Sequence, residues 1–233
     1  IPINYNFLKK INNQDIRNLS DINVISKYWL QAQKNFNSKN TTRIFKTHSA
    51  NISYLQKNFT DEKTTEGLIY IVRDPRDVVI SYSKHLNKSI DEVIDIMQHT
   101  NAITYSAKGN YPIILSRWDY HIKSWHKLKV PKLFIKYEHI LENTDSVINL
   151  LIKFLNNKLG YSIKIDDGTI DKIIFNTGFE KMKKQENVSG FLEASRYNPF
   201  FREGKKDQWK RLLNNNQISR ITKTFKNAMM KFD

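Results

Sequence analysis

Cysteine is absent from this chain of 233 residues. Its absence excludes a disulfide framework, a thiolate metal site and a cysteine nucleophile. It also fits a reducing compartment, so we expect a cytoplasmic location. Glycine and proline are scarce, with 7 and 5 residues, and this scarcity argues against low complexity or long disordered stretches.

Long hydrophobic runs are also missing. No apolar stretch approaches the length that a bilayer span needs, and no signal-like segment opens the chain at Ile1. We therefore expect no membrane span. The length suits one large domain, and no change in composition marks a linker, so the sequence predicts a single domain over residues 1–233.

The charge is strongly positive, because 38 basic residues face 23 acidic ones and give a net charge of +15. Such an excess indicates an anionic partner or an anionic surface. The aromatic residues do not alternate with basic ones as stacking platforms, and no nucleic-acid module is recognisable, so we expect no nucleic-acid partner. A basic binder of nucleic acid or of an anionic surface stays open as an alternative. AT-rich coding also enriches Lys, Asn and Ile and would raise the charge without a functional reason.

Strand and helix patterns alternate along the chain. Short apolar segments predict strands over residues 43–47, 68–72 and 132–137. Helical spacing predicts helices over residues 113–127, 147–155 and 217–232, and a capping box of Ser89 and Glu92 opens another with Ile90, Val93, Ile94 and Met97 as its buried stripe. The alternation predicts an α/β fold with a mainly parallel central sheet flanked by helices, whose ligands lie beyond the carboxyl ends of the strands.

The most informative segment runs from Tyr70 to Ser81. A strand ends at Arg73, and a helix opens with Pro75 in its first turn, where the missing N–H costs nothing. A basic residue beside the N-terminus of a helix can bind a phosphate-like anion, because backbone N–H groups and the helix dipole point the same way. A charged turn with Arg73 paired to Asp77 on the helix surface fits these residues equally well.

Five segments together resemble the cytosolic-type and bacterial sulfotransferases that use 3'-phosphoadenosine 5'-phosphosulfate. They are residues 45–48, 70–81, 137–138, 176–183 and 200–210, in that order. Trp118, His121 and Trp125 also match a tryptophan-histidine-tryptophan helix of the family. The resemblance implies a P-loop-like three-layer α/β fold, no metal, and transfer of a sulfonyl group to an acceptor hydroxyl or amine with release of adenosine 3',5'-bisphosphate.

The resemblance also implies roles for residues at the nucleotide. The counterparts of the family's 3'-phosphate ligands are Arg73 and Ser81, together with a loop of Arg202, Glu203 and Gly204. The counterparts of its adenine pocket are Tyr137, Thr177 and Phe179, although core packing explains Tyr137 and Phe179 nearly as well. Glu203 departs from a usual lysine, so we expect its carboxylate to point away from the phosphate. Asp207 replaces a usual glycine and puts the turn of the loop in question.

The pair Lys46 and His48 looks like the catalytic pair of the family. Histidine can accept the proton of the acceptor hydroxyl because its pKa lies near neutrality. Lysine can stabilise the negative charge that builds up during transfer. Residues 46 and 48 of a strand face the same side, so both side chains can reach one cavity. A loop histidine and an exposed lysine are the plain alternative for these two residues taken alone.

One element of the family is missing from the sequence. No glycine-rich loop for the 5'-phosphosulfate occurs before residue 40, and Ile1 to Leu8 resemble the segment that comes after that loop and its helix in bacterial members. We therefore expect a strand, loop and helix to precede Ile1. A non-catalytic nucleotide-binding module is the alternative if that loop is lost, and a P-loop kinase is a weaker one.

The acceptor is not defined by the sequence. Segments 1–42, 87–112 and 184–199 fall between the motifs, so we expect them to border the acceptor pocket. They carry aromatic residues that either line an apolar cleft or fill the core: Tyr5, Phe7, Tyr28, Trp29, Tyr105, Tyr111, Phe191 and Tyr197. The expected acceptor is a small molecule or a glycan, and the oligomeric state is open.

Overall fold

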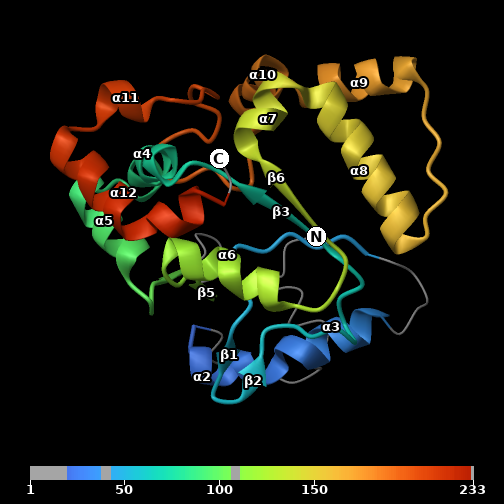
Figure 1. Cartoon of the computed structure of the whole chain (residues 1–233), viewed down its shortest axis with the longest axis horizontal. Coiled ribbons are helices and arrows are strands. Elements are labelled where there is room, and N and C mark those ends of the chain that lie inside the picture. Colours follow the sequence, from blue (N-terminus) through green and yellow to red (C-terminus); the bar gives the residue numbers. More distant parts are fainter. Residues whose placement is uncertain (1–19, 38–42, 106–110, 232–233) are drawn as a thin grey trace. The chain divides into compact units, whose positions relative to one another are not determined.

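The computed structural model describes residues 20–37, 43–105 and 111–231 (Figure 1). The chain divides into two compact units. The first combines residues 1–66 with 96–130, and the second combines residues 67–95 with 131–233. The single domain expected from the sequence stays a prediction. Among the helices of residues 20–37, 43–105 and 111–231, we find none that could span a membrane.

A parallel pair of strands forms the centre of the second unit. Strand β3 (Leu68–Val72) pairs with β6 (Lys132–Lys136), so that Leu68 lies opposite Lys132 and Val72 opposite Lys136 (Figure 1). The rings of Tyr70 and Phe134 stack with centroids 5.2 Å apart. Both predicted strands and their parallel pairing are confirmed, except that Tyr137 already begins a helix.

Helix α4 (Pro75–Leu86) begins directly after β3. The side chain of Asp74 caps it by accepting the Arg76 N–H at 2.8 Å, and Pro75 occupies the first turn as the sequence predicted. The helix ends where Asn87 takes the left-handed conformation, with φ of 53°. The strand-to-helix connection at Arg73 is therefore set by local sequence.

Further helices complete the second unit. After β6 come α7 (Tyr137–Glu142), α8 (Thr144–Leu159), α9 (Asp167–Thr177), α10 (Phe179–Ser189), α11 (Trp209–Leu212) and α12 (Asn215–Met229). Helix α12 packs against α4 and buries Ile221 and Phe225, as its spacing predicted. Ala228 is buried near its end and Met229 is half-buried, and residue 232, the predicted end of this helix, lies outside the described residues.

Helix α5 (Ile90–Gln98) opens with the predicted capping box. The Ser89 N–H donates to the Glu92 carboxylate at 2.9 Å, and the Glu92 N–H donates to the Ser89 hydroxyl at 3.3 Å. Val93, Ile94 and Met97 are buried, which confirms most of the predicted stripe.

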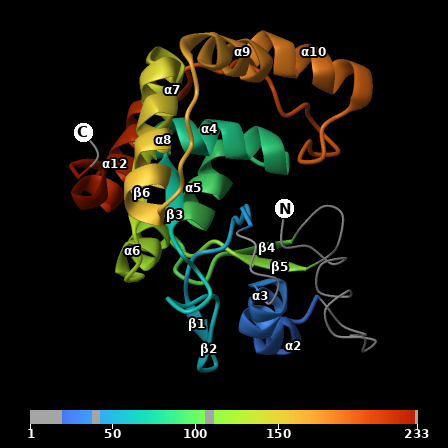
Figure 2. The same cartoon turned by 90° about the vertical axis from the view of Figure 1, so that its right-hand side faces the viewer.

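The first unit contains short elements around an aromatic core. Strands β1 (Ser53–Tyr54) and β2 (Lys57–Asn58) form an antiparallel pair, as do β4 (Ile103–Tyr105) and β5 (Pro112–Ile114) (Figure 2). The helices are α2 (Ile22–Ile25), the 3₁₀ turn η1 (Ser26–Tyr28), α3 (Trp29–Asn37) and α6 (Trp118–Lys127). Phe59 packs edge-on against Trp29 and Trp125, with centroid distances of 5.4 and 6.0 Å.

Two sequence predictions were wrong in this unit. Residues 43–47 are extended but form no strand, since Lys46 makes only an isolated bridge. The helix predicted from Ile113 starts at Trp118, because Ile113 and Ile114 pair with Thr104 and Ile103 in a strand. In both cases the pairing partner decided the structure, and a local apolar pattern does not reveal a partner.

Candidate functional site

Arg73 is held in a partly buried position at the end of β3. One of its terminal nitrogens, Nη2, donates to the Lys205 carbonyl at 2.9 Å, and Nη2 also lies 3.8 Å from Asp77 Oδ2. The guanidinium carbon sits 4.5 Å from the centre of the Tyr137 ring. The buried Nε has no hydrogen-bond partner within the described residues. A buried donor without a partner is uncommon, and it fits a cation that awaits an anionic ligand.

A second guanidinium lies near Arg73. Arg202 donates from Nη2 to the Ser81 carbonyl at 3.0 Å and from Nη1 to the Pro199 carbonyl at 2.9 Å. Burial lowers the pKa of Arg202, and the positive charge of Arg73 lowers it further. Arg73 is also hydrogen-bonded to Lys205, three residues after Arg202. Two cations that repel each other in this way favour a multivalent anion as ligand. The sequence assigned Arg73, Arg202 and the hydroxyl of Ser81 to one phosphate. The structure places Arg202 against the backbone carbonyl of Ser81 and connects Arg73 to the loop that carries Arg202.

The side chain of Ser81 is less clearly placed for a ligand. Its hydroxyl donates to the Val78 carbonyl at 3.0 Å, inside helix α4. To donate to a ligand, the hydroxyl would have to break its hydrogen bond to the Val78 carbonyl or share its proton between that carbonyl and the ligand. The role of the Ser81 side chain therefore stays a prediction.

The loop after Phe201 is shaped by a glycine and a buried carboxylate. Gly204 has φ of +60°, and a Cβ there would lie 2.4 Å from the Phe179 ring. Only glycine fits this position without a shift. Upstream, Glu186 on α10 accepts the N–H groups of Phe200 and Phe201 at 2.6 and 2.8 Å.

Both departures from the family pattern have a structural account. The Glu203 carboxylate lies between Lys84 at 3.9 Å and Arg211 at 3.6 Å, so its charge is matched by two cations. Asp207 adopts the left-handed backbone conformation with φ of 61°. Glycine enters that conformation most easily, and aspartate is among the few other residues that tolerate it. A left-handed turn therefore forms at this position although the residue is aspartate and not glycine.

Asp77 has a part that the sequence did not predict. Its Oδ2 accepts the Asp207 N–H at 2.8 Å, and its Oδ1 accepts the Trp209 N–H at 3.0 Å. The residue is only 2% exposed, and burial raises the pKa of its carboxyl. The plain alternative was an ion pair of Arg73 and Asp77 on the helix surface. The pair is present at 3.8 Å, but the burial of Asp77 contradicts the surface location. The only hint of this role in the sequence was that Asp77 follows Arg73 by four residues, the spacing at which two side chains can meet.

The three predicted adenine residues lie at ends of helices, and two of them contact the residues of the predicted phosphate site. Tyr137 is the first residue of α7 and lies against the Arg73 guanidinium. Phe179 is the first residue of α10 and packs on Phe201, with centroids 6.1 Å apart. Thr177 is exposed at the end of α9, and its hydroxyl donates to the Ile173 carbonyl at 2.8 Å. Their contact with a base stays a prediction.

Lys46 and His48 lie in the first unit, whereas Arg73 belongs to the second. Both residues are exposed, whereas Arg43, Phe45 and Thr47 are half-buried. The alternation expected of a strand therefore survives in this extended segment, and it turns the two side chains to one side. That the pair faces the same cavity as the nucleotide stays a prediction.

Helix α6 holds the main chain next to His48. His121 Nε2 lies 3.2 Å from the His48 carbonyl, and Trp125 Nε1 donates to the Ser49 carbonyl at 3.1 Å. Ser124 accepts the Asn51 N–H at 2.9 Å. Burial lowers the pKa of His121 to about 4, so its ring is neutral at pH 7 and can donate one N–H to the carbonyl. His121, which the sequence placed on the tryptophan-histidine-tryptophan helix, thus contacts the backbone carbonyl of the candidate base His48.

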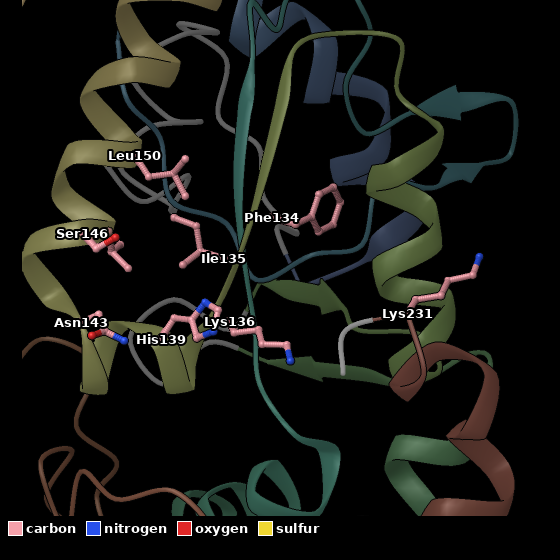
Figure 3. A pocket seen from close by; sticks show the side chains of 9 residues that line it. Phe134, Ile135, Lys136, His139, Asn143, Ser146, Leu150 and Lys231 are labelled. Carbon is pink, nitrogen blue, oxygen red and sulfur yellow. The ribbon is translucent and has the colours of Figure 1, made fainter.

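A cavity of about 450 Å³ opens elsewhere in the second unit (Figure 3). Its lining combines apolar and basic side chains: Phe134, Ile135, Lys136, His139, Asn143, Ser146, Val147, Leu150 and Lys231. None of the predicted site residues lines it. In the described part of the chain, no group of His, Asp and Glu residues is arranged to hold a metal ion.

Comparison with known proteins identifies the family. Residues 4–233 match the family model described as the sulfotransferase domain. Rat sulfotransferase 1A1 is 28% identical over 202 residues, covering 82% of this chain and 64% of that protein. Dog sulfotransferase 1B1 is 29% identical over 205 residues, covering 80% of this chain and 62% of that protein. The chain thus spans less than two thirds of the length of these relatives.

Solved structures show the same fold. Mouse sulfotransferase SULT7A1 in complex with PAP superposes with a TM-score of 0.58 and 21% identity, covering 76% of this chain and 64% of that one. Retinol dehydratase in complex with retinol and PAP gives a TM-score of 0.60 and 21% identity, covering 84% of this chain and 56% of that one. The likeness confirms the P-loop-like α/β fold predicted from the sequence. Since the family model matches nearly the whole chain, the chain belongs to the sulfotransferase domain family.

Proposed function

We propose that this chain is the nucleotide-binding and catalytic part of a sulfotransferase that uses 3'-phosphoadenosine 5'-phosphosulfate. Membership of the family supports this, as does the PAP in the complexes of SULT7A1 and retinol dehydratase. The observation that carries the proposal is the buried, unpartnered Nε of Arg73, whose guanidinium is hydrogen-bonded to the loop that carries Arg202.

The residues present fit a 3'-phosphate. The guanidinium groups of Arg73, with its unpartnered Nε, and of Arg202 supply charge-assisted donors of the kind that phosphate oxygens prefer. Arg73 and Arg202 would hold the phosphate, with the backbone of Glu203 and Gly204 and the hydroxyl of Ser81 beside them. Tyr137, Thr177 and Phe179 would border the adenine. When bound, the donor nucleotide supplies the activated sulfonyl group.

His48 is the proposed general base. It would take the proton from the acceptor hydroxyl or amine as the acceptor atom bonds to sulfur and the bond to the 5'-phosphate oxygen breaks. Lys46 would stabilise the negative charge that remains on the leaving oxygen. Both side chains are exposed on the same side of their segment, where an acceptor can reach them. Sulfonyl transfer of this kind requires mainly that the protein positions the two reactants and stabilises the developing charge, as in phosphoryl transfer.

The acceptor is proposed as a small molecule carrying a hydroxyl group. Two neighbouring structures of retinol dehydratase are complexes with retinol and with androsterone, which are both small and largely apolar alcohols. A glycan acceptor stays a second possibility.

Calorimetric titration with adenosine 3',5'-bisphosphate tests the nucleotide site, with 5'-AMP as the control ligand. We expect the bisphosphate to bind tightly and AMP to bind far more weakly. Arg73→Ala should weaken bisphosphate binding by about 1.5–3 kcal/mol, the range for a charge-assisted hydrogen bond. Arg220→Ala is a matched control, because Arg220 pairs with Asp91 and Asp95 on α5.

The outcomes separate the candidate functions. Equal affinity for both ligands, or an unchanged affinity in Arg73→Ala, would remove Arg73 from a 3'-phosphate site. Steep salt dependence without preference for the 3'-phosphate would favour the basic binder of nucleic acid or anionic surfaces. Selective binding without transfer by the full natural protein would favour a non-catalytic nucleotide-binding module.

A further inference from the structure

Asp77 lies one helical turn after Arg73, at the third residue of α4. Carboxylates in the first turn of a helix usually face solvent or the N–H groups of their own helix. Asp77 is instead 2% exposed and points to a loop that lies 130 residues further along the sequence. Burying a carboxylate is costly, so a position of this kind requires partners that offset the loss of solvent.

The partners of Asp77 are Arg73 and the stretch of chain that follows Gly204. Its two oxygens accept the N–H groups of Asp207 and Trp209, at 2.8 and 3.0 Å. Its Oδ2 also lies 3.8 Å from Arg73 Nη2. Each oxygen therefore has its own backbone donor, and the carboxylate shares its charge with the arginine.

Arg73 binds the loop as a hydrogen-bond donor, and Asp77 binds it as an acceptor. Arg73 donates to the carbonyl of Lys205, while Asp77 accepts from the amides two and four residues further on. The left-handed conformation of Asp207 lies at the centre of this stretch, between the carbonyl and the second amide. The loop that carries Arg202 and Gly204 is therefore held by three hydrogen bonds, one to Arg73 after β3 and two to Asp77 in the first turn of α4.

We propose that Asp77 is a positioning residue, which sets the distance between Arg73 and the loop that carries Arg202 and so preorganises the site for a 3'-phosphate. The inference rests on the proposed function. It extends that function, because Asp77 acts through Arg73 and the loop and does not itself touch the ligand.

Asp77→Asn is the sharpest variant. The amide keeps the shape of the side chain, but it has one acceptor oxygen in place of two and no charge for Arg73. One of the two loop amides then loses its acceptor. We expect the Kd for adenosine 3',5'-bisphosphate to rise about tenfold or more, and the Kd for 5'-AMP to change by less than about threefold.

The ratio of the Kd for 5'-AMP to the Kd for the bisphosphate distinguishes a positioning role of Asp77 from a general role in stability. A merely structural role would leave the preference for the 3'-phosphate intact in the folded variant. Asp95→Asn is the matched control: Asp95 pairs with Arg220 in the same unit and is exposed. We expect it to keep both affinities. Thermal unfolding of each variant confirms that the titrated protein is folded.

Hydrogen exchange on the unaltered protein gives a second test that does not depend on a variant folding. The amides of Asp207 and Trp209 should exchange slowly in the free protein, because both donate to a buried carboxylate. Exchange at the rate of exposed amides would overturn the inference, as would a 3'-phosphate preference unchanged in Asp77→Asn. If the unaltered protein does not prefer the bisphosphate, the proposed function fails first, whatever Asp77 does to the loop.

Discussion

The two arginines of the second unit and the Lys46–His48 pair of the first are held in different ways. Arg73 and Arg202 are fixed through their side chains, which donate to the carbonyls of Lys205 and Ser81. The segment of His48 is fixed through its backbone, by side chains of α6, while Lys46 and His48 themselves are exposed.

The difference fits two kinds of task. A binding site for a fixed anion gains affinity when its cations are already in place, because ordering them costs free energy otherwise. A general base needs a placed main chain and a side chain that an acceptor can reach. Changes in the second unit should therefore alter nucleotide affinity, and changes at His48 should alter turnover.

His48→Ala is expected to have the largest effect. Loss of a general base reduces turnover by a factor of about 10²–10⁴, whereas the Kd for the bisphosphate should stay within about twofold. Turnover is measured with the full natural protein and an acceptor found by screening phenols and alcohols. His126→Ala, on the exposed side of α6, is the matched control. If His48→Ala retains turnover, His48 is not the general base. If the variant loses affinity for the bisphosphate, the first unit also contributes to nucleotide binding, and the two tasks are not separate.

The support of His48 by His121 should appear as a dependence of stability on pH. Burial lowers the pKa of His121 to about 4, below the usual value near 6.5 in an unfolded chain. The unfolded state therefore binds the proton first as pH falls. The contribution of neutral His121 is present above pH 6.5 and is lost as pH falls through about 4, by about 3 kcal/mol in total.

Urea unfolding at several values between pH 7 and pH 4 measures this loss. In His121→Gln, which keeps a side-chain donor for the His48 carbonyl, the part of the slope due to His121 should vanish. The same slope in both proteins would show that His121 titrates as an exposed histidine does.

The smallest effect is expected at Asp207. Asp207→Gly removes the left-handed strain and keeps the N–H that donates to Asp77, so bisphosphate affinity should not change. Asp207→Ala also keeps the N–H but retains the steric cost of a Cβ, so it should be less stable than the glycine variant by about 1 kcal/mol. Chemical denaturation compares the two. Lost affinity in Asp207→Gly would mean that its carboxylate, and not the shape of the loop, serves the site.

Much of the second unit is determined by local sequence. The strand at Leu68–Val72, the turn at Pro75 and the box of Ser89 and Glu92 each depend on residues within about one helical turn. Their energies are local, so a pattern of residue types is enough to predict them. The resemblance of five separated segments then identified the family and the fold.

Local patterns of residue types did not predict the contacts between segments that are distant in the sequence. Residues 43–47 look like a strand but lack a continuous partner among the described residues, and Ile113 looks helical but pairs with Thr104. Asp77 looks like a surface carboxylate until the loop at Asp207 covers it. Which donors meet a buried carboxylate depends on chain segments more than 100 residues away, and only the tertiary structure brings those together.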